Sequence, residues 1–160
     1  MEQNEVILHS PGRERFRRAQ RLRSPHDFQR VRRLGRHVSS PLLTLSYARQ
    51  APQTARTQQP DEEHPDLPPE ASTAGTMEPP TRIGFSVSKR VGNAVIRNRV
   101  KRRLREAARH MLTDLLPGWD IVLGARSAAA AADYATLDTT VRELLARARL
   151  THLHSSRGLL

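Results

Sequence analysis

The residues best suited to do chemistry in this sequence are the arginines and lysines of its central segment. Between Arg82 and Arg109 the chain carries ten lysines or arginines and a single acidic residue, Glu106. Cationic side chains at this density repel one another unless a polyanion neutralises them, and nucleic acid is the obvious polyanion. The alternative, a solvated helix surface, usually mixes both signs of charge and fits this segment poorly. The segment therefore predicts binding to the phosphates of a nucleic acid.

Residues that could let the protein itself break a bond are not grouped in the sequence. The carboxylates that hold two metal ions in a protein nuclease should cluster. Several acidic residues instead fall at expected helix ends and turns: Asp114, Asp120, Asp133 and Asp138. Asp120 could hold magnesium, although turn formation explains it more simply. No glycine-rich loop precedes a lysine and a serine or threonine. We therefore predict no catalytic residue, no metal site and no cofactor bound by the protein.

The elements that position the basic segment follow from the spacing of its apolar residues. From Arg82 to Ser88 apolar and small residues alternate, which predicts a strand with Ile83, Phe85 and Val87 on one face. After Gly92 and Asn93, apolar residues recur every three to four positions, which predicts a basic amphipathic helix. The apolar residues of that helix are Ile96, Val100, Leu104, Ala107, Met111 and Leu115.

The remaining expected elements are a first helix, two strands and a last helix. Ser24, Pro25 and Asp27 are typical of a helix start, and Gly35 of its end. This helix should have an apolar stripe formed by Phe28, Val31 and Leu34. The strands are expected at 42–48 and 119–126, and the last helix from 134 to 148. The order α-β-β-α-β-α predicts an α+β fold, a two-layer sandwich of helices on a small sheet.

Composition divides the 160-residue chain, which has a net charge of +11, into one domain with extensions. Residues 1–20 form a basic N-terminal extension that we expect to be disordered until RNA binds. The domain spans 21–150 and is interrupted at 50–81 by a segment with seven of the eleven prolines and six acidic residues. We expect that segment to be a disordered acidic loop. Residues 151–160 form a C-terminal tail.

Cysteine and long apolar runs are absent from the sequence. The lack of cysteine excludes disulfides and thiolate metal sites. No apolar run approaches the roughly 18 residues of a membrane span, and the N-terminus does not have the pattern of a signal peptide. We expect a soluble, cytoplasmic protein with no membrane partner.

The central segment resembles the protein subunit of bacterial ribonuclease P, which matures the 5′ end of transfer RNA. The hallmark of that family, an Arg-Asn-Arg triplet, is matched by Arg97, Asn98 and Arg99. Three further segments resemble the family in the same chain order: 87–92, Asp27-Phe28 with Gly35, and 120–122 with Arg126. The resemblance covers about residues 20–150 apart from the acidic loop.

The resemblance implies a fold and a division of labour that the residue patterns alone do not give. Two parallel strands should be joined through the Arg-Asn-Arg helix by a left-handed crossover, although such connections are right-handed in about 98% of cases. An RNA subunit with bound Mg²⁺ should cleave precursor tRNA. The protein, expected at one copy per RNA subunit, should act as an accessory subunit of this endoribonuclease, binding the 5′ leader of the precursor and stabilising the holoenzyme.

The resemblance also implies roles for individual residues. Those that match leader-binding positions are Phe28, Ser86, Arg90, Arg97 and Asn98. Those that match positions facing the RNA subunit are Arg99, Lys101, Arg102, Arg103 and Arg105. Phe28 could instead be a core residue of the first helix, and the basic residues could be a solvated helix face. The sequence departs from the family at Arg32 and Ser46, where aromatic residues are expected.

Two other functions fit the basic helix. A ribosomal-type protein would bind folded ribosomal RNA through it, and a DNA-binding regulator would place it in a major groove. The second is less favoured because evenly spread charge suits contacts to the nucleic-acid backbone, whereas base recognition needs Asn, Gln and Arg at selected positions.

Overall fold

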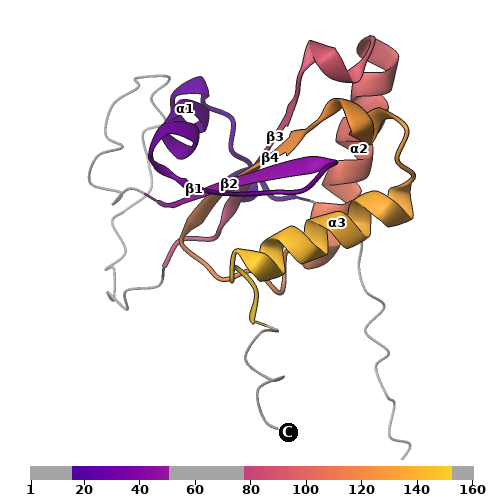
Figure 1. Ribbon diagram of the computed structural model, residues 1–160. Coiled ribbons are helices and arrows are strands. Elements are labelled where there is room, and N and C mark those ends of the chain that lie inside the picture. The colour runs from indigo at the N-terminus through magenta and orange to yellow at the C-terminus, as the bar shows by residue number, and fades with distance from the viewer. Residues whose placement is uncertain (1–15, 51–77, 153–160) are drawn as a thin grey trace, which may run out of the picture.

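A four-stranded mixed sheet organises the chain, with helices on both of its faces (Figure 1). The computed structural model describes residues 16–50 and 78–152. The predictions of disorder for the acidic loop and for most of the N-terminal extension therefore lie outside the described residues.

The strands of the sheet lie in the order β1-β2-β4-β3. β1 (Arg36–Ser39) and β2 (Leu43–Arg49) form an antiparallel hairpin, and β2 pairs antiparallel with β4 (Trp119–Ala125). β3 (Arg82–Val87) pairs parallel with β4 and is one of the two edge strands of this sheet. Because α2 (Ala94–Met111) connects β3 to β4, the parallel pair that the resemblance implies is confirmed.

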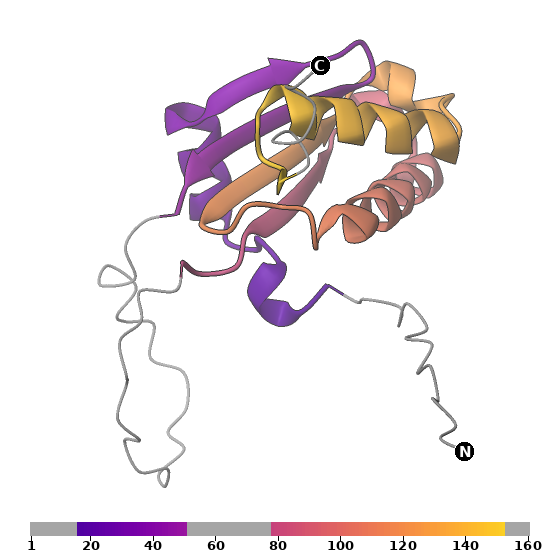
Figure 2. The same cartoon turned by 90° about the horizontal axis from the view of Figure 1, so that it is seen from below.

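The main core lies between the sheet and the helices α2 and α3 (Tyr134–Arg147), which pack side by side on one face (Figures 1 and 2). The alternation predicted for β3 is confirmed, because Ile83, Phe85 and Val87 pack on this core. Its largest fully buried residues come from β2, β4, α2, α3 and the segment after α3: Leu43, Leu45, Val100, Leu104, Ile121, Leu123, Leu137, Val141, Leu144, Leu145 and Leu150.

The turn from β3 into α2 has a glycine and a capping side chain in sequence. Gly92 has a φ of +149°, a conformation that glycine adopts without a steric penalty. Asn93 is the N-cap of α2, and its side-chain oxygen accepts a hydrogen bond from the backbone N–H of Ile96 at 3.0 Å. These two residues therefore fix where the basic helix begins.

Helix α1 (Pro25–Leu34) packs on the opposite face of the sheet, over a smaller buried cluster of Leu22, Val31 and Val122. At its end, a Cβ on Gly35 would lie 2.2 Å from the backbone oxygen of Val31. Only glycine therefore lets α1 turn directly into β1. The predicted apolar stripe of α1 was wrong at its last member, because Leu34 is 79% exposed.

The α+β class is confirmed, and the structure adds three features that the sequence patterns missed. Strand β1 precedes the predicted first strand, so the order is α-β-β-β-α-β-α with α1 on its own face. Phe16, which precedes the boundary expected at residue 21, packs against the main core. Residues 18–20 form a short 3₁₀ helix, η1, and Arg21 then forms a parallel bridge to Ile83 of β3.

Candidate nucleic-acid interface

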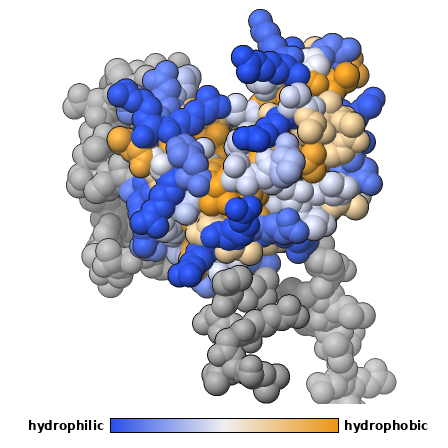
Figure 3. Space-filling view, viewed as in Figure 1, coloured by the Kyte–Doolittle hydropathy of each residue, from blue (hydrophilic) through white to orange (hydrophobic). Residues whose placement is uncertain are grey.

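A cleft with a floor of small side chains lies on the α1 face of the sheet. Strand register places Thr44, Gly124 and Ser86 in one row across β2, β4 and β3, and Ser46 in the next row. Figure 3 shows a hollow in the surface between the part formed by α1 and the part formed by the start of α2. We call this hollow the α1–α2 cleft. Its small floor residues leave room for a ligand.

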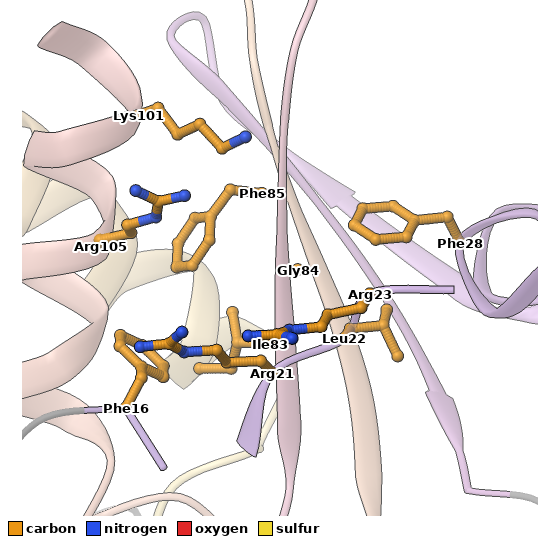
Figure 4. A pocket seen from close by; sticks show the side chains of 10 residues that line it. All are labelled: Phe16, Arg21, Leu22, Arg23, Phe28, Ile83, Gly84, Phe85, Lys101 and Arg105. Carbon is orange, nitrogen blue, oxygen red and sulfur yellow. The ribbon is translucent and has the colours of Figure 1, made fainter. Parts of the chain in front are cut away.

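Phe28 projects from α1 toward β3, where its ring lies against Gly84 (Figure 4). A Cβ on Gly84 would lie 2.4 Å from Cζ of Phe28, so the missing side chain is what makes space for the ring. Phe28 also packs beside Val31 and Val122, and it is only partly buried. Phe28 was predicted either to bind the leader or to be a core residue. The structure is compatible with both roles, since one ring packs on the small core and keeps an accessible surface.

Arg32 and Ser46 occupy the positions near the cleft where aromatic residues were expected, and His37 lies beside Ser46. The Arg32 guanidinium, one helical turn after Phe28, donates a hydrogen bond to the Ser86 hydroxyl. His37 of β1 is the register partner of Ser46, and its Nδ1 lies 2.8 Å from the Ser46 hydroxyl oxygen. An imidazole ring therefore stands beside the position that lacks an aromatic side chain. Sequence reasoning missed His37 because the strand that carries it was not predicted.

The other predicted leader-binding residues lie at the connection from β3 to α2, on the rim of the cleft opposite α1. Arg90 is exposed in the short 3₁₀ helix η3 (Lys89–Val91). Arg97 and Asn98 follow in the first turns of α2, where Asn98 is exposed and Arg97 partly buried. The Nε of Arg97 is buried and has no hydrogen-bond partner among the described residues. The structure therefore places the predicted leader-binding residues on three parts of the chain that border one cleft: α1, β3 and the connection from β3 into α2.

The predicted RNA-subunit residues do not share one environment. Arg99, Arg102 and Arg105 are exposed on α2, and Lys101 is partly buried. Arg103 instead points toward the segment that precedes α3, where its Nη1 donates a hydrogen bond of 2.6 Å to the backbone oxygen of Ala132. Arg103 thus ties α2 to the loop that leads into α3, and the exposed three remain available to a partner.

A pocket of about 420 Å³ lies around the edge of β3 (Figure 4). Its lining includes Phe28 from α1 together with Lys101 and Arg105 from α2. The structure therefore brings one predicted leader-binding residue next to two predicted RNA-subunit residues, whereas the other predicted residues do not line this pocket. We call it the β3-edge pocket.

A buried ion network holds α1 on the sheet below the cleft. The Asp120 carboxylate is fully buried and binds the guanidinium groups of Arg30 from α1 and Arg82 from β3. Arg82 also reaches Asp27 of α1 at 3.1 Å. Burial by itself would lower the pKa of Arg82, but hydrogen bonds to Asp120 and the charges of both carboxylates raise it above its ordinary value. The turn suggested for Asp120 was wrong, whereas the strand expected at 119–126 contains it correctly, since Asp120 lies within β4 and binds two arginines.

No group of three or more histidine or acidic side chains is placed to hold a metal ion in the described part of the chain. Within the same residues, no helix is long and apolar enough to cross a membrane.

Comparison with known proteins assigns the family. The model of the family described as Ribonuclease P matches residues 16–149. The chain belongs to the ribonuclease P protein family. A relative from Roseiflexus castenholzii, a ribonuclease P protein component, is 39% identical over 83% of this chain and 88% of its own length. Another from Herpetosiphon aurantiacus is 38% identical over 86% of this chain and 90% of its own.

A solved structure shows the same fold. The ribonuclease P protein of Staphylococcus aureus superposes with a TM-score of 0.62 at 25% identity, over 84% of this chain and 99% of that one. The chain is therefore an accessory, RNA-binding subunit of ribonuclease P, an endoribonuclease of tRNA processing, and an RNA subunit is its partner. This assignment removes the ribosomal-protein and DNA-regulator alternatives.

Proposed function

We propose that the chain binds the 5′ leader of precursor tRNA in the α1–α2 cleft and holds the RNA subunit through the exposed cations of α2. The observation that carries the proposal is the position of Phe28, whose accessible ring borders a cleft with a floor of small residues. Any of the four bases can stack on such a ring, so this contact does not depend on the sequence of the RNA. A leader differs between precursors, so contacts of this kind suit it.

Cations around the ring supply the second part of leader binding. Arg32 stands one turn from Phe28, and Arg90 and Arg97 lie on the opposite rim. Guanidinium groups bind phosphate through paired hydrogen bonds and remain charged at any physiological pH. The cleft therefore combines one stacking surface with cations on both sides, which is the composition of single-strand binding sites.

Helix α2 presents the surface for the RNA subunit. Arg99, Arg102 and Arg105 project from its exposed side, and no acidic residue lies between them in the sequence. Neutralising phosphates with these side chains releases counterions, so the affinity should depend strongly on salt. We propose one protein per RNA subunit in a cytoplasmic holoenzyme. The cleavage step is assigned to the RNA subunit and its Mg²⁺, for which the protein supplies positioning.

Reconstitution with a bacterial ribonuclease P RNA transcript tests this function. Cleavage of a precursor tRNA is followed at limiting Mg²⁺, with and without the protein, and binding is compared for the precursor and for mature tRNA. We expect the protein to raise the cleavage rate and to favour the precursor over mature tRNA. Equal binding of both tRNAs would contradict leader recognition, and unchanged cleavage would contradict the accessory role.

A further inference from the structure

The β3-edge pocket is lined in part by residues that belong neither to the predicted leader-binding site nor to the predicted RNA-subunit site. On the α1 side of β3 Phe28 and Leu22 line it, and on the α2 side Phe16 and Phe85 do (Figure 4). Ile83 and Gly84 of β3 also line it, together with four cations: Arg21, Arg23, Lys101 and Arg105. Phe16, Phe85, Arg21 and Arg23 belong to neither of the residue sets that the family resemblance gave.

Two aromatic rings form one wall of this pocket. The centroids of Phe16 and Phe85 lie 5.9 Å apart, and the rings meet edge to face at 88°. Both residues are only partly buried, so ring surface remains accessible to a ligand. The segment that carries Phe16 is held on the sheet because Leu22 donates a backbone hydrogen bond of 3.1 Å to Ile83. The wall is therefore supported by the backbone of the edge strand.

The charges of the pocket have a single sign. Among the residues that the structure describes, no acidic residue lines the pocket, and none of these four cations forms an ion pair. In Figure 4, Lys101 and Arg105 extend from α2 toward β3, while Arg21 and Arg23 lie along the N-terminal segment. A ligand of matching chemistry carries negative charge around a flat apolar group, and a nucleotide has that form.

We propose that the β3-edge pocket holds one unpaired nucleotide of the RNA subunit, with its base against Phe16 and Phe85 and its flanking phosphates at the four cations. This inference rests on the proposed function. The volume of about 420 Å³ falls within the range of ligand pockets, about 300–1,000 Å³. A base that is paired within a duplex has no free face to offer to the rings, so the nucleotide must be unpaired.

The position of the pocket favours the RNA subunit over the leader. Lys101 and Arg105 belong to the same helix as the exposed Arg102, so RNA held along α2 reaches the pocket without crossing the sheet. The floor of the α1–α2 cleft, by contrast, lies on the other face of β3. Phe28 borders both spaces and marks where the two RNAs approach each other.

Crosslinking from inside the pocket identifies its occupant. Phe16 is replaced by the photoreactive residue p-benzoylphenylalanine, and the variant is assembled with the RNA subunit and a precursor tRNA, irradiated, and mapped by primer extension. We expect a crosslink to an unpaired nucleotide of the RNA subunit. A crosslink to the leader or to paired nucleotides only, or no RNA crosslink from an assembled holoenzyme, would overturn the proposal.

A matched pair of variants measures the stacking itself. Phe16→Leu keeps an apolar side chain but removes the ring, and its affinity for the RNA subunit should fall about 5- to 150-fold, the value of one base–aromatic stack. Tyr134→Leu removes a partly buried ring at the start of α3 and should leave the affinity unchanged. Equal affinities for Phe16→Leu and wild type would refute the pocket while leaving the proposed function intact. Failure of the wild-type protein to bind the RNA subunit would instead refute the proposed function.

Discussion

The contact between Phe28 and Gly84 can be disrupted from either side, and each change should weaken leader binding. Replacing Phe28 with leucine keeps apolar volume against Val31 and Val122 but removes the ring face. The loss of one base stack is worth about 1–3 kcal/mol, so Kd for precursor tRNA should rise about 5- to 150-fold. Mature tRNA lacks a leader, and its Kd should stay close to the wild-type value.

Gly84→Ala tests the same contact without removing the ring. The new Cβ would lie 2.4 Å from Cζ of Phe28, a separation that non-bonded carbon atoms do not tolerate, so the ring must move away from β3. We expect a selective loss of precursor affinity in this variant too. Because the change adds one methyl group at the sheet surface, the main core between the sheet and α2 should keep its packing.

Thermal stability separates leader binding from a purely structural role. A fully buried phenylalanine costs about 3–5 kcal/mol when it is cut to alanine. Phe28 is only partly buried, so Phe28→Leu should cost well under that amount. Binding is measured by fluorescence anisotropy with the assembled holoenzyme, and melting by circular dichroism. A variant that melts early and loses affinity equally for precursor and mature tRNA would refute the reasoning.

Four further outcomes are expected. Nuclease-treated protein, incubated alone with precursor tRNA and Mg²⁺, should yield no 5′ product on a gel, and cleavage would contradict the division of labour. In a salt titration of RNA-subunit binding, Arg99→Ala and Arg102→Ala should each flatten the slope of log affinity against log salt by about one unit; an unaltered slope would show that this surface faces elsewhere. Arg103→Ala should lower the melting temperature but leave that slope unchanged, because its hydrogen bond is to the backbone of Ala132; a flattened slope would place it at the RNA. Asp120→Ala leaves two arginines without their buried partner and should cost about 3–5 kcal/mol in urea unfolding, whereas wild-type stability would show that the network contributes little.

The parts of the fold with a strong local signal could be predicted from sequence. Alternation in β3 and three-to-four spacing in α2 both gave the correct buried faces, and Asn93 marked the start of α2. These features depend on residues close together in the chain. They were sufficient to place the basic helix and its exposed cations.

The features that sequence did not reveal depend on contacts between distant segments. β1 has four residues, of which only Val38 is apolar, so its sequence has no alternation that would predict a strand. Leu34 continues the helical spacing, but α1 ends beyond the edge of its small core, and the side chain stays exposed. Asp120 has the local pattern of a turn residue, and its two arginines come from positions 30 and 82. The β3-edge pocket was missed for the same reason, since its lining comes from three separate segments.

The two cores of this protein differ greatly in size, which bears on how its parts unfold. The face covered by α2 and α3 buries most of the apolar side chains, whereas α1 is held by a cluster of three buried residues, one of them its own Val31, and by a group of ion pairs. Segments with few buried contacts open locally at a lower free energy than the whole domain. We therefore expect helix α1, one rim of the α1–α2 cleft, to open as a separate unit, and a ligand held between the two rims to stabilise α1 in its docked position. The free energy of docking α1 therefore contributes to the affinity for RNA. A substitution in α1 that weakens docking should lower that affinity even when the residue does not contact the RNA.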